Sequence, residues 1–583
     1  GGHKELLAYL VRRLLENGAN TSFVNRMGDA DIPPEELVGD PVAELAALSP
    51  RRNPAIPLPG AIFGARLNSA GVDLSDPLVR EPLLDKLKAL ESAIWTAEPT
   101  FSEENPDELH AITMPHDGRV VVGTRRDATP QEVEAAFTRA AAIQPGWDAL
   151  GGEARALLLE NAADLFEAHT AEFLSLCQRE AGKTLLDSVL ELREAVDFLR
   201  YYAAEARRQF AAPVILPGPT GEENTLSLHG RGVFATISPW NFPLAIFIGM
   251  ASAALAAGNS VIAKPAEQTP LIAALAVRLC HQAGIPPEAL QLLPGGGEVG
   301  QLITANPLLA GVAFTGSTDT ARAINRALAN RDGPIATLIA ETGGQNAMIV
   351  DSSALPEQVV RDVLASSFQS AGQRCSALRV LYLQEDIADG VLEMIRGGFA
   401  ALTLGDPADL ATDVGPVIDA EAKALLESHV ADCAARGLKV ERLPGTPTIG
   451  HFVAPTIIEI AAIGALAREN FGPVLHVARF EAGELGKVVD EINACRFGLT
   501  LGLHSRIAET RRFVQARAKV GNFYVNRNQI GAVVESQPFG GEGLSGTGPK
   551  AGGPHYLARF ATERVVCIDT TAAGGNASLL AAG

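Results

Sequence analysis

The chain has 583 residues, of which 47% are hydrophobic and 20% charged, and this composition excludes a disordered chain and allows sizeable buried cores. Its 48 basic and 68 acidic residues leave a formal net charge of −20, which argues against a general nucleic-acid or anionic-membrane surface. Six scattered cysteines without a CxxC pair argue against a disulfide framework and a metal site, and they indicate a reducing, cytoplasmic compartment.

The first predicted elements are mainly helical. An amphipathic helix over 3–17 precedes a Pro-rich stretch, 28–80, which we expect to be a connecting region with little core of its own. Long amphipathic runs follow, interrupted by one apolar strand at 119–123; these runs cover 130–143, 153–181 and 187–209.

One stretch has the polarity of a membrane span, because Leu244 to Ala263 carries no charge over 20 residues. Pro243 precedes this stretch, however, and Gly258-Asn259 breaks it. We interpret it as a buried helix of about 14 residues followed by a turn and the strand 260–263, so no membrane span is predicted.

Short β-rich runs alternate with helices from 232 to 351. This alternation predicts a parallel sheet with helices on both faces. A second alternating block covers 356–525, and the tail after 526 is rich in Gly and β-branched residues. The fold class is therefore predicted as α/β. The runs of the first block are 233–238, 260–263, 290–293, 311–314, 335–340 and 346–350.

Two glycine-containing runs have the form of phosphate-binding loops. Gly295-Gly296-Gly297-Glu298-Val299-Gly300 follows an apolar run and leads into a helix, where glycines would let a pyrophosphate approach the helix N-terminus. Three glycines also occur in any tight strand-to-helix turn, so both interpretations stay open. The run Glu180 to Thr184 ends like a P-loop, but Cys177 stands where the first glycine belongs, and we reject that interpretation.

Two residues are candidates for nucleophile and base. Cys375 follows Arg374, whose charge would favour the reactive thiolate, although a buried structural cysteine is the alternative. Glu341 ends an apolar strand and precedes two glycines, so a desolvated carboxylate there would serve as a general base. The alternative for Glu341 is a capping or turn acid.

Side chains beyond two further strands are candidates for ligand contacts. Asn241 follows the strand 233–238 and offers an amide that would donate to an oxyanion. Lys264 and Glu267 lie just past the next strand, where ligands of open α/β sheets bind. A solvated ion pair is the alternative for these two residues.

Taken in order, these motifs resemble the aldehyde dehydrogenase superfamily over roughly residues 100–570. One departure is mild, since Thr342 and Gln345 stand where Leu and Lys are commoner. The matching segments are Pro239–Pro243, Lys264–Glu267, Phe314–Ser317, Glu341–Gly344, Gly372–Cys375 and Glu469–Pro473.

Within that superfamily, Arg374–Ala377, Val525–Arg527 and Gly531–Gly541 resemble the 1-pyrroline-5-carboxylate (L-glutamate γ-semialdehyde) dehydrogenases. The C-terminal Thr570–Leu580 resembles the end of bacterial bifunctional proline utilization A proteins. Tyr9–Gly18 resembles the last barrel helix of proline dehydrogenase, whose arginine pair grips the proline carboxylate; a surface helix is the alternative. A flavin-binding barrel needs on the order of 200–250 residues, so the proline dehydrogenase half and its FAD are expected to be absent.

The resemblance implies an aldehyde dehydrogenase fold with a Rossmann-like NAD-binding domain, an α/β catalytic domain and a β-flap oligomerisation arm, and it implies a homodimer. The expected divisions are a barrel remnant at 1–27, a linker at 28–95, an NAD-binding domain at 96–340 with an oligomerisation hairpin at 212–231, a catalytic domain at 341–525, and a substrate-anchor loop with the C-terminal flap at 526–583.

The implied reaction is the NAD-dependent oxidation of L-glutamate 5-semialdehyde to L-glutamate in proline catabolism. Cys375 would attack the aldehyde, Asn241 would hold the oxyanion, and Glu341 would activate water. A carboxylate at Glu267 would repel a 2′-phosphate, so NAD is expected rather than NADP. The implied cofactor contacts are Ser238, Pro239, Trp240, Lys264, Ala266, Glu267, Gly297, Gly300, Phe314, Gly316, Ser317, Thr342, Gly343, Glu469 and Phe471.

The substrate carboxylate is expected to meet a neutral anchor, formed by the Ser376 hydroxyl and by backbone N–H groups near Gly531. Two other functions stay open: a dehydrogenase of another acid semialdehyde, such as succinate semialdehyde, and a catalytically silent oligomerisation module of a larger enzyme. The implied substrate contacts are Phe242, Arg374, Ser376, Gly531, Ala532 and Phe539.

Overall fold

The computed structural model describes residues 27–569 except 30, 35–37, 39, 50 and 103–108, and the chain divides into two compact units, Gly1–Ile62 and Phe63–Gly583. In the first unit the described residues form helix α4 (Pro41–Ala47), which begins where the Asp40 side chain accepts the Val42 N–H. The helix predicted over 3–17 and the motif after residue 569 lie outside the described residues.

A five-stranded parallel sheet of order β10-β9-β6-β7-β8 forms the centre of the first half of the second unit. Phe234 of β6 packs into one hydrophobic core, whereas its neighbours Val233 and Ala235 pack into another. Both faces are therefore buried, as the alternation of strands and helices predicts. The strands are β6 (Val233–Ile237), β7 (Ser260–Lys264), β8 (Leu290–Leu292), β9 (Leu309–Gly316) and β10 (Thr337–Thr342).

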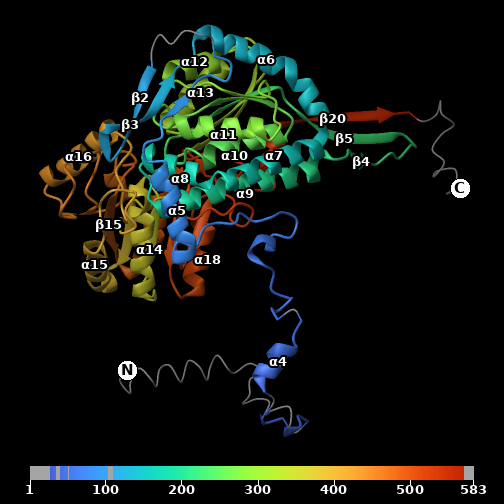
Figure 1. The fold of residues 1–583 in the computed structure, drawn as a ribbon. Coiled ribbons are helices and arrows are strands. Elements are labelled where there is room, and N and C mark those ends of the chain that lie inside the picture. The colour runs from blue at the N-terminus through green and yellow to red at the C-terminus, as the bar shows by residue number, and fades with distance from the viewer. Residues whose placement is uncertain are drawn as a thin grey trace. The chain divides into compact units, whose positions relative to one another are not determined.

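Helices cover both faces of this sheet (Figure 1). On one face lie α6 (Pro130–Ala149), α12 (Gly297–Ala305) and α13 (Thr318–Ala329), which contribute to the smaller core. The larger core lies on the other face and is formed by α7 (Gly151–Ala168), α8 (Thr170–Arg179), α9 (Leu185–Phe210), α10 (Ala245–Ala256) and α11 (Pro270–Gln282).

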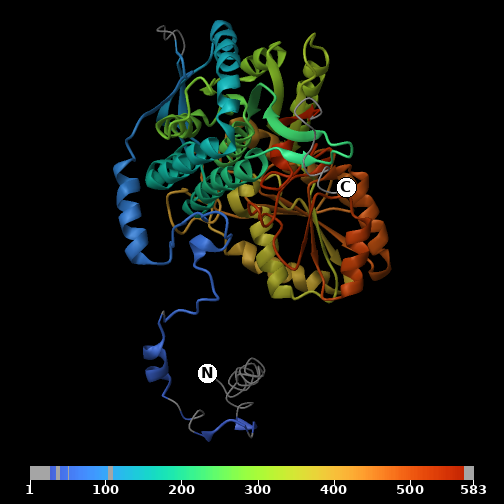
Figure 2. The same cartoon turned by 90° about the vertical axis from the view of Figure 1, so that its right-hand side faces the viewer.

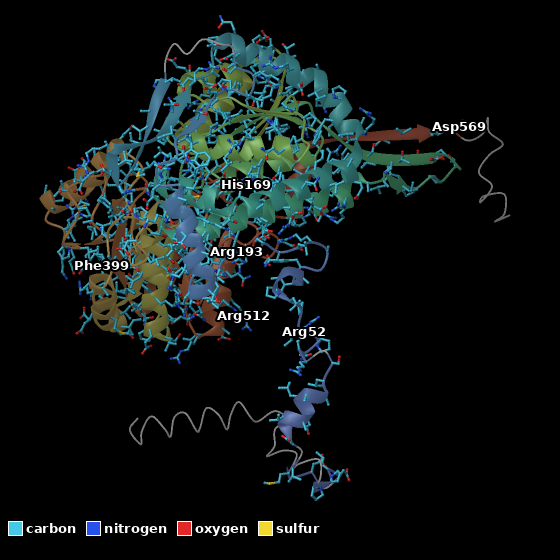
Figure 3. All side chains as sticks on the ribbon, in the orientation of Figure 1. Arg52, His169, Arg193, Phe399, Arg512 and Asp569 are labelled. Atoms are coloured by element: carbon cyan, nitrogen blue, oxygen red, sulfur yellow. The ribbon has the colours of Figure 1, made fainter. Side chains whose placement is uncertain are left out.

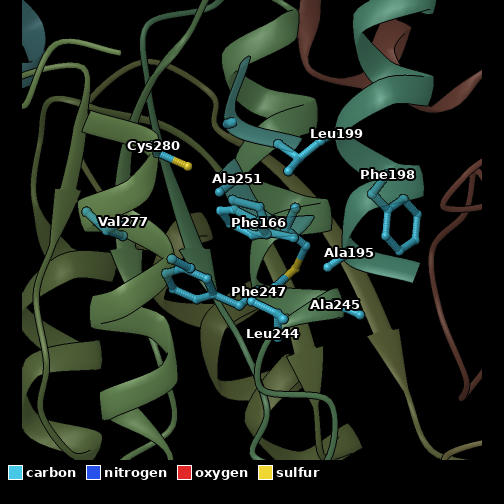
Figure 4. Close-up of a cluster of buried hydrophobic side chains, with 14 of the residues drawn as sticks. Phe166, Ala195, Phe198, Leu199, Leu244, Ala245, Phe247, Ala251, Val277 and Cys280 are labelled. Carbon is cyan, nitrogen blue, oxygen red and sulfur yellow. The ribbon is translucent and has the colours of Figure 1, made fainter. Parts of the chain in front are cut away.

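The larger core joins helices that are distant in the sequence. Figure 4 shows Phe166 of α7, Leu199 of α9 and Phe247 of α10 in one cluster, and all three are fully buried. Helix α10 and strand β7 confirm that the uncharged stretch is a buried helix, a turn and a strand. The run predicted at 153–181 is two helices, α7 and α8, with a break at His169.

A seven-stranded sheet forms the second half of this unit, in the order β13-β14-β15-β12-β11-β17-β18, and all neighbours are parallel except the edge strand β13. Figure 2 shows this half in yellow to red, with helices beside the sheet. The sheet confirms the second alternating block. The placement of the run 346–350 in the first block is wrong, because this run forms β11 and pairs with strands of this second sheet. Its elements are β11 (Ala347–Val350), α14 (Pro356–Phe368), β12 (Val380–Gln384), α15 (Glu385–Ala400), α16 (Ala420–Ala435), β13 (Val440–Arg442), β14 (Thr456–Glu459), β15 (Val474–Phe480), α17 (Leu485–Ala494), β17 (Thr500–His504), α18 (Ala508–Arg517) and β18 (Asn522–Val525).

The compact second unit begins at Phe63, inside the stretch expected to be a linker. Arg66 and Ser69 are buried there, and both are hydrogen-bonded to Asp197 of α9. Helix α5 (Pro77–Ala89) then packs against α8. A small sheet follows, made of β1 (Trp95–Ala97), β2 (Leu109–Met114) and β3 (Asp117–Arg126), of which only the middle of β3 is predicted from the sequence.

An arm of three antiparallel strands extends away from the helices (Figure 1). It contains the hairpin predicted at 212–231, which is β4 (Val214–Leu216) and β5 (Glu223–Gly230), and strand β20 (Ala561–Ile568) pairs with β5. Helix α19 (Tyr556–Arg559) leads into β20, and the short strands β16 (Phe497–Gly498) and β19 (Glu542–Gly543) pair elsewhere. Among the helices of the described residues, none has the length and apolarity needed to cross a bilayer.

Candidate active site

Two cavities meet at Cys375. The larger has a volume of about 830 Å³ and the smaller about 340 Å³, and both are lined by Thr315, Thr342 and Cys375. Thr315 and Thr342 lie near the carboxyl ends of β9 and β10, where open parallel sheets bind their ligands. The cysteine is thus accessible from both cavities.

The larger cavity is a cleft with the features of a dinucleotide site. Ser317 lies in its wall and caps α13, with its Oγ accepting the Thr320 N–H at 3.1 Å, so backbone N–H groups of the helix N-terminus are directed to the cleft. Glu469 lies against Gly343, where any side chain would clash with its carboxylate. The predicted cofactor residues that line the cleft are Pro239, Trp240, Gly316, Ser317, Thr342, Gly343, Glu469 and Phe471, together with Asn241.

Other predicted cofactor residues lie outside that cleft. Lys264 is buried at the end of β7, its alkyl chain faces Gly300, and burial lowers the pKa of its ammonium group. Glu267 is exposed, and its carbonyl accepts a hydrogen bond from Arg125 at 2.6 Å. Residues near this strand end include Ser238, whose N–H donates to the Lys264 carbonyl, and Ala266.

One predicted cofactor contact, Phe314, is placed differently from the expectation, and Gly297 lies outside the cleft lining. Phe314 belongs to the smaller hydrophobic core, and its ring lies beneath Gly316, so it does not line the cleft. Gly297 begins α12 and faces open space, whereas its neighbour Gly295 has φ +151° and leaves no room for a side chain beside Val299. The tight-turn interpretation of this glycine run therefore accounts for Gly295.

The loop before Cys375 has an unusual backbone. Ser370, Ala371 and Gly372 all have positive φ angles, of 56°, 53° and 64°. Such strain persists only where the surroundings hold it. The buried Arg379 guanidinium does so by donating to the carbonyls of Gly372 at 2.7 Å and of Arg374 at 3.0 Å.

Arg374 does not act as predicted on the Cys375 thiol. Its guanidinium Nη2 donates to Asp187 Oδ1 at 3.0 Å, so the buried Asp187 balances its charge. Burial raises the pKa of Cys375 to about 12, and the nearby carboxylates of Glu469 and Glu341 contribute in the same direction. The cysteine is therefore a neutral thiol in this state.

Glu341 is a desolvated carboxyl group. Its Oε2 accepts the Gly541 N–H at 3.2 Å, and its buried Oε1 has no hydrogen-bond partner among the described residues. Burial raises the pKa of Glu341 to about 8. It caps no helix of the described chain and lines the smaller cavity, which supports the general-base interpretation over the alternative of a capping acid.

Asn241 adjoins the cysteine loop, since its Nδ2 donates to the Gln373 carbonyl at 3.1 Å. A buried ion pair that the sequence did not reveal positions it. Lys183 Nζ donates to the Asn241 carbonyl at 2.7 Å and pairs with Glu191 Oε2 at 2.6 Å. Glu191 also accepts the Leu244 N–H at 2.8 Å, so the pair holds both ends of the loop.

Helix α9 carries the acidic residues that sequence reasoning missed. Asp187, Glu191, Glu194 and Asp197 recur at intervals of three or four residues and therefore share one face of the helix. Three of them are buried and hydrogen-bonded to separate loops. An acidic residue at every turn of the buried side of a helix is the signal that identifies them.

The smaller cavity contains every predicted substrate contact. Apolar residues of α9 and α10 form part of its wall, and the charged residues Arg193 and Glu194 also line it. Burial raises the pKa of Glu194 to about 7. Figure 3 labels Arg193 on α9. The predicted contacts brought together here are Phe242, Arg374, Ser376, Gly531, Ala532 and Phe539.

Comparison with known sequences agrees with this arrangement. The sequence model of the aldehyde dehydrogenase family matches residues 101–566, and that of proline dehydrogenase matches residues 1–26. The chain is 50% identical over 583 residues to the bifunctional protein PutA of Salmonella typhimurium, covering 97% of this chain and 43% of that protein. It is 34% identical over 502 residues to the 1-pyrroline-5-carboxylate dehydrogenase of a Geobacillus species, covering 82% of this chain and 97% of that protein.

Solved structures show the same relationships. A mutant of Bradyrhizobium japonicum proline utilization A matches with a TM-score of 0.88 and 52% identity, over 98% of this chain and 55% of that chain. A mutant of Thermus thermophilus 1-pyrroline-5-carboxylate dehydrogenase matches with a TM-score of 0.81 and 32% identity, over 86% of this chain and 98% of that chain. The chain thus spans about half the length of the bifunctional relatives and nearly the whole length of the dehydrogenases.

Proposed function

The chain belongs to the aldehyde dehydrogenase family, as its motifs indicate, and we propose that it oxidises L-glutamate 5-semialdehyde, the open form of 1-pyrroline-5-carboxylate, to L-glutamate. The observation that carries this proposal is the position of Cys375 between a cleft suited to a dinucleotide and a cavity suited to an amino-acid aldehyde. Because the chain spans only about half of the bifunctional relatives, the proposal covers this one reaction.

The smaller cavity matches the substrate along its length. Phe242 and Phe539 offer apolar surface to the aliphatic stem. The Ser376 hydroxyl and the backbone N–H groups of Gly531 and Ala532 offer donors to the α-carboxylate. Glu194, an acidic group in the same cavity, offers an acceptor to the α-ammonium group.

Enzymes of this family use NAD or NADP. The cleft fits such a dinucleotide, because α13 presents its N-terminus for a pyrophosphate and Glu469 lies where a ribose hydroxyl would find an acceptor. When bound, the dinucleotide accepts the hydride that the substrate loses. The finer preference for NAD rests on the exposed carboxylate of Glu267, which with Lys264 is assigned to the adenosine ribose.

The protein residues perform the remaining steps. The Cys375 sulfur forms a bond to the aldehyde carbon and its proton passes to water, and the oxygen that becomes negative accepts hydrogen bonds from Asn241 Nδ2 and the Cys375 N–H. Loss of the hydride from the same carbon restores the carbonyl and leaves a thioester on Cys375. The Lys183–Glu191 pair keeps Asn241 in place for this purpose. Glu341, in its ionised form, takes a proton from the water that hydrolyses the thioester.

Reduction of NAD with 1-pyrroline-5-carboxylate, compared with succinate semialdehyde, tests the proposal. We expect faster NADH formation with 1-pyrroline-5-carboxylate and none from Cys375→Ala with either compound. A preference for succinate semialdehyde would assign the enzyme to another acid semialdehyde. If neither compound yields NADH, the chain is instead a catalytically silent oligomerisation module.

We propose that the arm makes the chain a homodimer in the cytoplasm. Val214, Leu226 and Val565 are cross-strand neighbours in the arm, and the two valines are 59% and 54% exposed. A narrow sheet with apolar residues in solvent is marginal alone, so a second copy is the expected cover. All six cysteines are free thiols, which fits a reducing compartment.

Light scattering tests the dimer. Val565→Asp should shift the molecular mass toward that of one chain, because a buried charge opposes association. Val121→Asp, at a valine of 41% exposure on β3, is the matched control and should leave the mass unchanged. Equal masses for both variants and the unmodified protein would exclude the arm as the interface.

A further inference from the structure

We propose that Arg66 is a positioning residue of the substrate cavity, which ties the loop carrying Gly531 and Ala532 to helix α9 and so sets selectivity for aldehydes that bear a carboxylate. The inference rests on the proposed function. Arg66 precedes residue 101, where the match to the family begins, so the family motifs do not include it.

Arg66 is a buried cation that joins two separate elements. Its side chain is 2% exposed. Its Nη1 donates to Asp197 Oδ1 on α9 at 2.9 Å, and its Nε donates to Glu535 Oε2 at 2.8 Å. The Val534 carbonyl accepts a third hydrogen bond, from Nη2 at 3.4 Å. One planar guanidinium therefore fixes the distance between the helix and the loop.

Both partners lie at the substrate cavity. Asp197 and Val534 line it together with Gly531 and Ala532, and Glu535 follows Val534 directly. Glu535 has a φ of +74°, a left-handed conformation that a residue with a side chain adopts only where its surroundings hold it. The hydrogen bond from Arg66 holds the Glu535 side chain and so helps to keep this backbone conformation.

Arg66 completes a set of anchors on α9. Asp187 holds the loop before Cys375, Glu191 holds the Asn241 loop with Lys183, and Asp197 holds the anchor loop through Arg66. All three carboxylates come from one face of one helix. This helix therefore sets the positions of the nucleophile, the oxyanion donor and the carboxylate anchor relative to one another.

Arg66 acts through position and not as a cation for the substrate. Its charge is matched by two carboxylates, and it is absent from the cavity lining. Removing it leaves Asp197 bonded to Ser69 but frees the side chain of Glu535 from α9. The N–H groups of Gly531 and Ala532 then lose a fixed position, while Cys375 and Glu341 keep theirs.

The test compares Arg66→Gln with the unmodified protein on L-glutamate 5-semialdehyde and on propanal. Because a small misplacement of a binding group costs up to about 100-fold, we expect KM for the semialdehyde to rise about 10- to 100-fold. The kcat for the semialdehyde and kcat/KM for propanal should stay within about twofold, since neither depends on the anchor. Equal losses on both aldehydes, or no change on either, would overturn the proposal.

Three variants separate positioning from general destabilisation. Arg80→Gln removes an arginine–carboxylate pair on α5, far from the cavity lining, and should leave both substrates unchanged. Arg66→Lys keeps one charge without the planar fork and should restore part of the selectivity. Glu535→Gln removes only the loop end of the contact; it should reproduce the KM effect and should not add to that of Arg66→Gln.

The same measurements distinguish failure of the proposed function. If Arg66→Gln does not fold, Glu535→Gln takes its place, because this carboxylate is 37% exposed. The measurement is again the ratio of kcat/KM for the semialdehyde to kcat/KM for propanal. If the unmodified protein prefers another acid semialdehyde, the proposed function fails. The Arg66 proposal is then tested by the ratio of kcat/KM for that aldehyde to kcat/KM for propanal.

Discussion

Replacing Glu341 with Gln separates the two halves of the reaction. The amide keeps the shape of the carboxyl group and its acceptor for the Gly541 N–H, but it cannot take a proton from water. Thiohemiacetal formation and hydride loss depend on Cys375 and Asn241, so the first turnover should survive. Hydrolysis of the thioester should become the slow step.

The magnitude follows from the environment of the carboxyl group. A positioned general base contributes about 10²- to 10⁴-fold, equivalent to about 3–5 kcal/mol of activation free energy. Burial raises the pKa of Glu341 to about 8. At pH 7 about one-tenth of the carboxyl groups are then ionised, so hydrolysis by the unmodified protein should rise about tenfold between pH 7 and pH 9.

Stopped-flow recording of NADH formation measures both halves. Glu341→Gln should show a burst of about one NADH per active site, followed by a steady rate that is about 10²- to 10⁴-fold lower and nearly independent of pH across the range of the Glu341 titration. Cys375→Ala serves as the control and should show neither phase. A normal steady rate in Glu341→Gln, or an unchanged pH dependence, would mean that another group takes the proton from the hydrolytic water.

Other substitutions test the remaining assignments. Cys375→Ala should abolish dehydrogenase activity but retain dinucleotide binding by calorimetry; a residual kcat above a few per cent would remove Cys375 from the mechanism. Ser376→Ala should lower kcat/KM for the semialdehyde by about 1–2 kcal/mol and spare propanal, and equal losses would exclude the anchor role. Glu267→Gln should improve kcat/KM with NADP relative to NAD, because the repulsion of a 2′-phosphate is removed; an unchanged ratio would place discrimination elsewhere. Because burial raises the pKa of Glu341 from 4.5 to about 8, the folded protein retains a proton that the unfolded chain loses, and stability falls as the pH rises through this range. The Tm of Glu341→Gln relative to the unmodified protein should therefore be higher at pH 8 than at pH 5, and a constant difference by calorimetry would contradict the raised pKa.

Local patterns in the sequence predict most of the secondary structure and the reacting groups. Strands β6 to β10 and helix α10 follow from apolar runs and glycine turns, because burial periodicity is a property of neighbouring residues. Cys375, Glu341 and Asn241 are identified from short motifs, because each lies at a strand end or turn that its neighbours define. The structure places Cys375 where the two cavities meet, Asn241 in the wall of the larger cavity and Glu341 in the wall of the smaller one.

Only the tertiary structure decides how the charged groups act. The sequence places Arg374 beside Cys375, but Asp187, 187 residues away, accepts its charge, and burial makes the cysteine a neutral thiol. Arg66 reaches Glu535 across 469 residues. Such partners leave no periodic signal, because side chains from distant segments meet only after the sheets and helices pack. Desolvation and ion pairing, which set the pKa values and positions of the reacting groups, depend on that packing.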